Sequence, residues 1–213
     1  WNLDYVVSPT GDSATYFYAN ETNYYKQNRS TKTKYDRGGY LKRIQYGERA
    51  GSEGTSPAAQ VDFVVKERCI VGGKVTNCET ATPSATTTGN WPDVPVDAIC
   101  SSTSCTTALT SPTFFTRKRL TQVSTKVKNT AGSYDPVDTW DLTQTWPSGS
   151  DTSSPAMWLA QIKQTGKGGT AIAMPPVKFT PVVLDNRVAT ASSGELYGKP
   201  RMSQITTETG GLI

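Results

Sequence analysis

Apolar and polar residues alternate along much of the chain, and its first stretch shows the pattern clearly. In residues 1–7, one side carries Trp1, Leu3, Tyr5 and Val7, and the other carries Asn2, Asp4 and Val6. A period of two residues is typical of a β-strand with one buried face. The turn sequence at residues 9–12 and the aromatic run at residues 15–18 then predict a hairpin. A third strand is predicted at residues 40–46, after a Gly-Gly pair.

The same alternation returns later, so the sequence predicts an all-β protein. We expect an antiparallel sheet or sandwich of about 8–11 strands joined by long polar loops. Further strands are predicted at residues 60–66, 117–128, 137–146, 156–164, 170–174, 177–184 and 200–207. Two of these stretches leave an alternative open. The apolar spacing in residues 117–128 also suits a helix, although its Thr and Val content favours a strand with a bulge between Leu120 and Val123. A short helix is the alternative at residues 156–164.

Other stretches are predicted to form connections. Residues 20–38 are interpreted as a long polar loop in which basic residues are interleaved with tyrosines. Such a loop could bind single-stranded nucleic acid, but the small net charge favours an ordinary solvated loop. Residues 49–59 are interpreted as a linker and residues 69–89 as a polar loop. Residues 91–97 contain two prolines, which lack a ladder donor, so an extended segment that packs Trp91 and Val96 onto the sheet is expected.

The amino-acid composition further limits the class of protein to which the chain can belong. A chain of 213 residues suits a single β-rich domain spanning residues 1–213. Only 35% of the residues are hydrophobic, so the core is expected to use aromatic side chains as much as aliphatic ones. The net charge of +4 does not by itself hold a protein on nucleic acid or on an anionic membrane. No apolar run spans a membrane and no signal peptide is recognisable, so a fragment or processed piece of a larger protein is expected.

The four cysteines fall into two close pairs, which predicts two local disulfides. Pairing nearest neighbours gives Cys69–Cys78 and Cys100–Cys105, each closing a polar loop. The alternative is a zinc site of four thiolates, but these spacings are longer than the usual zinc knuckles. Disulfides indicate an oxidising compartment, so we expect a protein that is secreted or lies at the cell surface.

Candidate catalytic chemistry is sparse. The chain has no histidine, which excludes the serine and cysteine triads that depend on it. Asp93 and Asp97 would lie roughly 13 Å apart on an extended strand, too far for a glycosidase pair without a bend. Asp135, Asp138 and Asp141 carry oxygen ligands but do not match the spacing of an EF-hand. We therefore expect no enzyme activity, no metal site and no cofactor.

A polysaccharide-binding β-sandwich is the alternative function. Exposed planar rings stack on sugars, and the candidate ligand-binding residues are Trp91, Trp140, Trp146 and Trp158. The competing interpretation, which we favour, is that these rings fill a core that is short of aliphatic side chains.

Several separated stretches resemble one known family. They are residues 1–7 with the Pro-x-Gly turn and residues 15–18, then YDRGGYLKRI at 35–44, WPDVP at 91–95 and RMSQITTET at 201–209. Together they resemble the region preceding the tyrosine-aspartate repeats in large secreted bacterial RHS/YD-repeat proteins. Asp12 stands where relatives usually have Asn, and Ser8 replaces a frequent Asp, so the detail of the first turn differs.

The resemblance implies a parent protein that is much longer than this chain. In the family, β-hairpins coil into a hollow shell that encloses a C-terminal toxin or other cargo. This chain would be a non-catalytic structural segment upstream of that shell or within it, and its partner would be the rest of the parent polypeptide. Cell-surface polysaccharide is the partner that the alternative implies, and no nucleic-acid partner is expected. The self-cleaving aspartates of the family lie in another region, and no residue here matches them.

Overall fold

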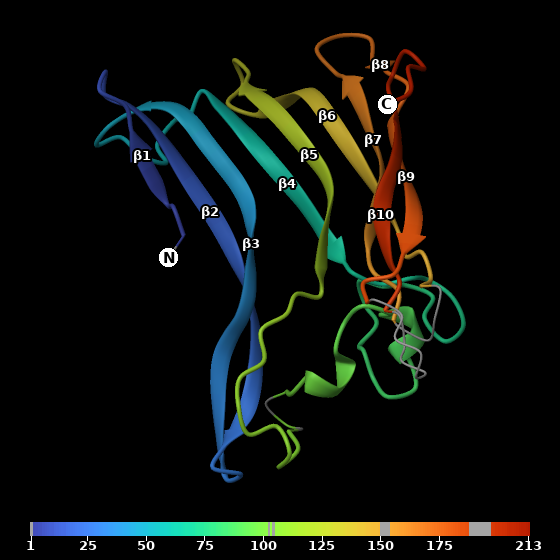
Figure 1. Ribbon diagram of the computed structural model, residues 1–213. Coiled ribbons are helices and arrows are strands. Elements are labelled where there is room, and N and C mark those ends of the chain that lie inside the picture. The colour runs from blue at the N-terminus through green and yellow to red at the C-terminus, as the bar shows by residue number, and fades with distance from the viewer. Residues whose placement is uncertain (1, 102, 104, 150–153, 188–196) are drawn as a thin grey trace. The chain divides into compact units, whose positions relative to one another are not determined.

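The structure is a computed structural model that describes residues 2–101, 103, 105–149, 154–187 and 197–213. The chain divides into two compact units. The first comprises Trp1–Leu120 and Thr125–Asp135, and the second comprises Thr121–Ser124 and Pro136–Ile213. In the described residues, ten strands form one antiparallel sheet in the order β1-β2-β3-β4-β5-β6-β7-β9-β10, with β8 pairing to β7 (Figure 1). The predicted all-β fold is confirmed as a sheet that does not close into a barrel.

The strands of the first unit follow one another as antiparallel neighbours. They are β1 (Tyr5–Val7), β2 (Asp12–Gln27), β3 (Thr31–Arg49) and β4 (Ala59–Glu67). The next strand, β5 (Lys118–Lys128), contributes residues to both units. The strand prediction for residues 117–128 is therefore confirmed, and the helical alternative for that stretch is wrong.

The β2–β3 hairpin is much longer than the sequence indicated. Its strands pair from Asp12 opposite Arg49 to Gln27 opposite Thr31, with three register shifts. The prediction of a long connection at residues 20–38 is therefore wrong. The turn is confined to the tip, where Asn28 and Arg29 adopt left-handed φ angles of 51° and 60°. The distal half was missed because both of its faces carry polar residues, which hides the alternation on which strand prediction depends.

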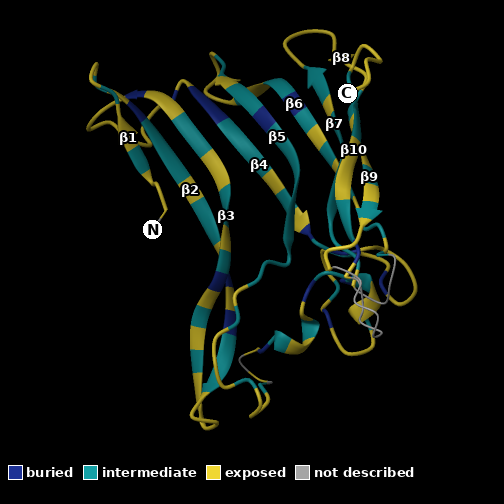
Figure 2. Cartoon of the chain, viewed as in Figure 1, coloured by how far each residue is buried: buried dark blue, intermediate teal, exposed yellow. Residues whose placement is uncertain are grey.

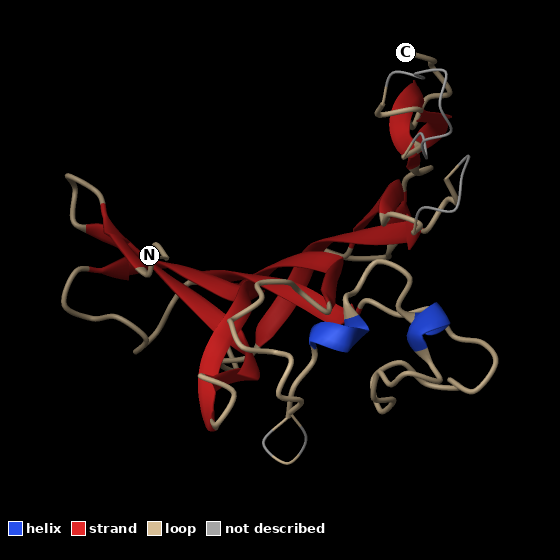
Figure 3. Cartoon of the chain, turned by 60° about the horizontal axis from the view of Figure 1, so that its bottom comes forward, coloured by secondary structure: helices blue, strands red, loops and turns tan. Residues whose placement is uncertain are grey.

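The buried apolar cluster of the first unit lies in the connection between β4 and β5. It consists of Cys69, Val75, Trp91 and Val94. Two short 3-10 turns, η1 (Thr88–Asn90) and η2 (Val96–Ala98), shape this connection, and both lie on one side of the first unit's strands (Figure 3). The expectation of an extended segment at residues 91–97 is wrong, because the backbone N–H of Val94 donates to the carbonyl of Trp91 and a 3-10 turn begins at Val96.

Both predicted disulfides are present. Cys69 bonds to Cys78 and Cys100 bonds to Cys105, so no cysteine of the chain is free for zinc. The zinc alternative is therefore wrong. Closing loops of this length stabilises a fold by about 2–3 kcal/mol each in the chain-entropy account. Both disulfides lie in the connection between β4 and β5, where backbone hydrogen bonds to regular strands are few.

The second unit is built from β6 (Tyr134–Thr145), whose first two residues belong to the first unit, and four later strands. These are β7 (Trp158–Gly166), β8 (Ile172–Ala173), β9 (Val177–Leu184) and β10 (Lys199–Thr206). The strand prediction near residues 156–164 is confirmed over the short helix. After β10 the chain turns back, and Ile205 and Ile213 exchange two backbone hydrogen bonds of 2.9 and 3.0 Å.

The second unit has one mainly apolar face, and an opposite face that is polar on β6 and β7 but carries Val182 and Leu184 on β9. Register places Leu142, Ile162 and Val177 opposite one another across β6, β7 and β9. Trp140, Phe179 and Ile205 extend this apolar row, and all six side chains are half-buried. The other face carries Thr143, Gln161 and Lys178 in one row and Asp141 opposite Lys163 in the next. Among the described residues of this unit no hydrophobic side chain is buried (Figure 2).

Candidate functional site

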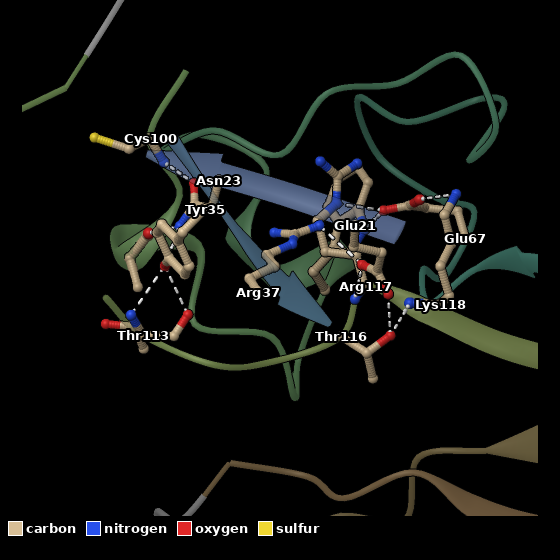
Figure 4. Close-up of polar contacts among 12 residues, drawn as sticks. Glu21, Asn23, Tyr35, Arg37, Glu67, Cys100, Thr113, Thr116, Arg117 and Lys118 are labelled. Atoms are coloured by element: carbon tan, nitrogen blue, oxygen red, sulfur yellow. Dashed lines mark hydrogen bonds and ion pairs between the residues drawn. The ribbon is translucent and has the colours of Figure 1, made fainter. Parts of the chain in front are cut away.

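The densest group of buried charges lies in the first unit, where the connection between β4 and β5 meets β2 and β3. Glu21 on β2, Arg37 on β3 and Glu67 at the end of β4 are only 6%, 7% and 3% exposed. Charged side chains are rarely buried to this degree unless they are paired. We call this group, together with Thr116, Arg117 and Lys118, the ion clamp (Figure 4).

Glu21 joins three parts of the chain. Its Oε2 accepts from Nη2 of Arg37 at 2.9 Å and from the backbone N–H of Arg117 at 2.9 Å, and its Oε1 accepts from the hydroxyl of Thr116. The approach is close, because a Cβ added to Gly38 would lie 3.3 Å from the carbonyl oxygen of Phe115. Glycine at this position therefore lets the connection lie against β3.

Arg37 is held between its carboxylate partner and an aromatic ring. The guanidinium carbon lies 4.5 Å from the centre of the Phe115 ring, a distance typical of a cation–π contact. Burial lowers the pKa of Arg37, while the charge of Glu21 acts in the opposite direction. Arginine remains charged at neutral pH despite such shifts, so the ion pair is present.

Glu67 is the second carboxylate of the ion clamp. Its Oε1 accepts from the indole N–H of Trp91 at 3.0 Å and from Nε of Arg117 at 2.7 Å, and its Oε2 accepts from Nζ of Lys118 at 3.0 Å. Its backbone N–H donates to Oε1 of Glu79 at 2.9 Å. Glu67 thus connects the end of β4, the start of β5 and the central tryptophan of the buried cluster.

A second set of hydrogen bonds fixes the same connection further along the hairpin. The amide of Asn23 donates to the carbonyl of Ala98 at 2.9 Å and accepts from the backbone N–H of Cys100 at 2.7 Å. The hydroxyl of Tyr35 donates to the carbonyl of Thr113 at 2.7 Å, and it accepts from the N–H of Thr113 and from Asn23. These contacts satisfy the hydrogen-bonding capacity of the tyrosine hydroxyl.

The hydrogen bonds of the ion clamp indicate a structural role. All four carboxylate oxygens of Glu21 and Glu67 already accept hydrogen bonds from the chain itself. Neither group is therefore positioned to take a proton from a bound substrate without first releasing its own partners. The arrangement holds the disulfide-bridged connection against the face of β2 and β3.

The structure separates the four tryptophans predicted as sugar ligands. Trp91 is 1% exposed at the centre of the buried cluster, so its assignment as a surface sugar ligand is wrong. Trp140, Trp146 and Trp158 are half-buried in the second unit. Trp140 lies opposite Gln164, whereas Trp158 lies opposite Thr145 and donates from Nε1 to the carbonyl of Phe179 at 2.8 Å. Trp140 and the partner of Trp158, Thr145, are five positions apart on β6, which is roughly 17 Å along the strand. This separation is too large for both rings to contact one sugar ring.

The candidate acids are also dispersed. Asp93 pairs with Arg68 at 3.1 Å, and Asp97 lies in the turn η2. Asp135 accepts from the amide of Asn129, and Asp141 accepts from the amide of Gln122 at 2.7 Å. Asp138 accepts from Gln164 at 3.3 Å. In the part of the chain that the structure describes, no three histidine, cysteine or acidic side chains form a group able to hold a metal ion.

A smaller ion cluster crosses three strands of the first unit. Asp62 on β4 accepts from Nε of Arg43 on β3 at 2.7 Å and from Nζ of Lys126 on β5 at 2.7 Å. Gln60 donates to the same carboxylate at 3.0 Å. Partial burial by itself would raise the pKa of Asp62, but the hydrogen bonds from Lys126 and Arg43 outweigh it and hold the pKa below its ordinary value.

Replacing Asp62 with Asn is expected to destabilise the first unit by about 1 kcal/mol at pH 7, because the side chains of Arg43 and Lys126 are partly exposed and their pairing is screened. A depressed pKa contributes stability above the unfolded-state value and loses it as the pH falls through the folded-state value. The difference between wild type and Asp62→Asn should therefore shrink towards zero below pH 4. Urea unfolding at pH 7 and pH 3 measures it, and an undiminished difference at pH 3 would contradict the assignment.

Sequence reasoning did not identify the ion clamp. The only local signals were charged residues at single positions inside strands, such as Arg37 beside the Gly-Gly pair that precedes Tyr40. Such residues are ordinarily solvated, so they do not indicate burial without knowledge of what covers the strand.

Comparison with known proteins gives a limited result. No protein-family model matches the chain, and no curated protein matches it in sequence. Two crystal structures, of TcdB2-TccC3 and of TcdB2-TccC3-TEV, are similar in fold, with TM-scores of 0.46 and 0.47 and identities of 17% and 18%. Each match covers 85% of this chain, which spans 9% of the matched chain.

A helix long and apolar enough to cross a membrane is not found among the described residues.

Proposed function

We propose that this chain is a non-catalytic structural β segment of a larger secreted protein of the RHS/YD-repeat type. Its strands form part of a wall, and its partner is the rest of the parent polypeptide. The two disulfides support a location outside the cytoplasm, since such bonds persist in oxidising compartments. In this proposal, the chain provides a continuous sheet against which other segments of the parent polypeptide pack.

One observation carries the proposal: among its described residues, the second unit has no layer that covers its apolar face. Trp140, Leu142, Ile162, Val177, Phe179 and Ile205 form this face. All six are only half-buried, and the described part of the unit contains strands and their connections but no helix. A sheet that is apolar on one face normally buries it against a second layer. In our proposal, polypeptide outside this unit supplies that layer.

The edge strand β10 supports the same proposal. Ile205 and Ile213 donate to and accept from each other, which is the hydrogen-bonded pair of an antiparallel ladder. The outer edge of β10 thus accepts an antiparallel strand. At Ile205 this edge is already occupied by the residues that follow β10, and the earlier part of the same edge is a template for further pairing.

Hydrogen–deuterium exchange tests the proposal on two proteins, the present chain alone and the chain together with the segments that flank it in its gene. We expect the amides of β6, β7, β9 and β10 to exchange more slowly in the longer protein, because the covered sheet opens less often. Binding of the dye ANS, which reports exposed apolar surface, should fall at the same time. Equal exchange and equal dye binding in both proteins would overturn the proposal.

A further inference from the structure

The outer half of the β2–β3 hairpin presents a compact group of lysines beside one tyrosine. Lys26 on β2 lies directly opposite Lys32 on β3, and the next pair on the same face is Tyr24 opposite Lys34. Residues paired in this way project from the same face of the ladder. Nζ of Lys32 lies 5.9 Å from the centre of the Tyr24 ring. We call these four residues the lysine face.

The lysine face is the open side of the hairpin. The alternate residues Asn23 and Tyr35 point to the other side, where they bond to the connection between β4 and β5. Lys32 and Lys34 are exposed, and Lys26 and Tyr24 are half-buried. Large ligands therefore have access to the lysine face while the opposite side of the same strands is occupied.

The charge of this region is unbalanced. Residues 22–35 contain no acid, and residues 98–116, which include the part that contacts the hairpin, contain no charged residue. The nearest acid in sequence on this face, Asp36, lies one pair further along opposite Thr22 and accepts from the amide of Asn20 at 2.9 Å. Among the described residues, none of the three lysines forms an ion pair with an acidic side chain.

The pairing of Lys26 with Lys32 does not favour folding of the hairpin. Like charges directly opposite each other on neighbouring strands are destabilising, and Lys26 and Lys32 are such a pair. Both flexible side chains can reach one anionic group, because directly opposite Cβ atoms lie about 5 Å apart. An anionic ligand would turn the repulsion into attraction, which gives the cluster a physical role that the isolated hairpin lacks.

We propose that the lysine face binds an acidic polysaccharide, with a sugar ring against Tyr24 and carboxylates against the lysines. A single-stranded nucleic acid is less suited, because it needs successive stacking platforms and Tyr24 is the one aromatic ring on this face of the hairpin's outer half. Lysine also acts as a point charge without the planar fork by which arginine grips phosphate in two places. This site is separate from the proposed structural role and from the tryptophans considered above.

Binding of polygalacturonate oligomers, measured by titration calorimetry at low ionic strength, tests the proposal. The triple variant Lys26→Gln, Lys32→Gln, Lys34→Gln should bind at least about tenfold more weakly, because each exposed charge contact contributes a few-fold and all three are lost. Tyr24→Val should weaken binding of polygalacturonate but not of polyglutamate, which has the charge without the ring. The triple variant should melt close to the wild type, since removal of the repulsive pair offsets loss of the contact between Lys32 and Tyr24.

A matched variant controls for net charge. Lys42→Gln, Lys163→Gln, Lys178→Gln removes the same three charges from exposed strand positions elsewhere and should bind as the wild type does. If the control variant loses as much affinity for polygalacturonate as the first triple variant, the effect depends only on net charge and the proposal is overturned. So would absence of polygalacturonate binding, equally strong binding of neutral dextran, or tighter binding of a single-stranded oligonucleotide. None of these outcomes bears on exchange in β6–β10, so the proposed structural role is tested separately.

Discussion

Replacing Trp91 with Ala is expected to lower the free energy of unfolding of the first unit by about 4 kcal/mol, the middle of the range for a fully buried large aromatic side chain. Trp91 is 1% exposed and lies at the centre of a small cluster with Cys69, Val75 and Val94. The loss should be large for a single residue, because few other buried apolar side chains in the described part of the chain lie beside Trp91 to close the cavity. Urea unfolding followed by far-ultraviolet circular dichroism measures it.

A second substitution separates the volume of the indole from its hydrogen bond. Trp91→Phe keeps most of the apolar surface but removes the N–H that donates to Glu67 at 3.0 Å. We expect this variant to lose about 2 kcal/mol, since hydrogen bonds to charged groups contribute roughly 1.5–3 kcal/mol. Trp158→Phe, in the half-buried second unit, is the matched control and should leave the unfolding of the first unit unchanged. A Trp91→Ala protein as stable as the wild type would contradict the placement of the core.

The strands that the sequence predicted well are those with one apolar face. In β9, Val177, Phe179, Pro181 and Val183 alternate with more exposed residues, and the structure reproduces this alternation along the whole strand. The alternation is visible in the sequence because the residues on one face of this strand are more buried than those on the other. The local disulfides were predictable for a similar reason, since each depends on cysteines that are only 9 and 5 positions apart.

The distal half of the β2–β3 hairpin could not be predicted in the same way. One face there carries Asn23 and Tyr35 and the other carries Lys26 and Lys32. Neither face is aliphatic, so no period of two residues appears in the hydrophobicity. The pairing is instead fixed by the long uninterrupted ladder and by hydrogen bonds to the connection between β4 and β5. Such bonds are decided by tertiary structure and leave no local signal.

The ion clamp was unpredictable for the same physical reason. Glu21 and the backbone of Arg117 lie 96 positions apart, and Glu67 and Arg117 lie 50 positions apart. Nothing near Glu21 in the sequence indicates that a polar connection will cover it. Trp91 shows the converse: the sequence is compatible with both a buried and a ligand-binding tryptophan, and the choice depends on distant neighbours such as Glu67.

Glu67→Gln is expected to destabilise the first unit by about 3 kcal/mol, because removing one partner of a buried ion pair leaves the others uncompensated. Glu67 is 3% exposed and faces two cations, Arg117 at 2.7 Å and Lys118 at 3.0 Å. The value lies at the low end of the range for buried pairs because the side chains of Arg117 and Lys118 remain 20% and 28% exposed, and water screens part of their charge. Glu208→Gln removes the same charge from an exposed position and should change the stability by less than about 0.5 kcal/mol.

The location of the amides that exchange faster in Glu67→Gln distinguishes a local anchoring role from a general effect of lost charge. When Glu67 is neutral, the start of β5 and the connection before it lose an anchor, while the outer bonds at Asn23 and Tyr35 remain. Hydrogen–deuterium exchange should therefore accelerate first at the amides of Arg117 and Lys118, and later or not at all at Cys100. Adding Lys118→Met to Glu67→Gln should recover part of the stability, because the stranded cation is removed along with its partner. Additive losses in the double variant, or uniform exchange across the connection, would show that Glu67 and Lys118 do not act as a pair and that the connection is held by its disulfides alone.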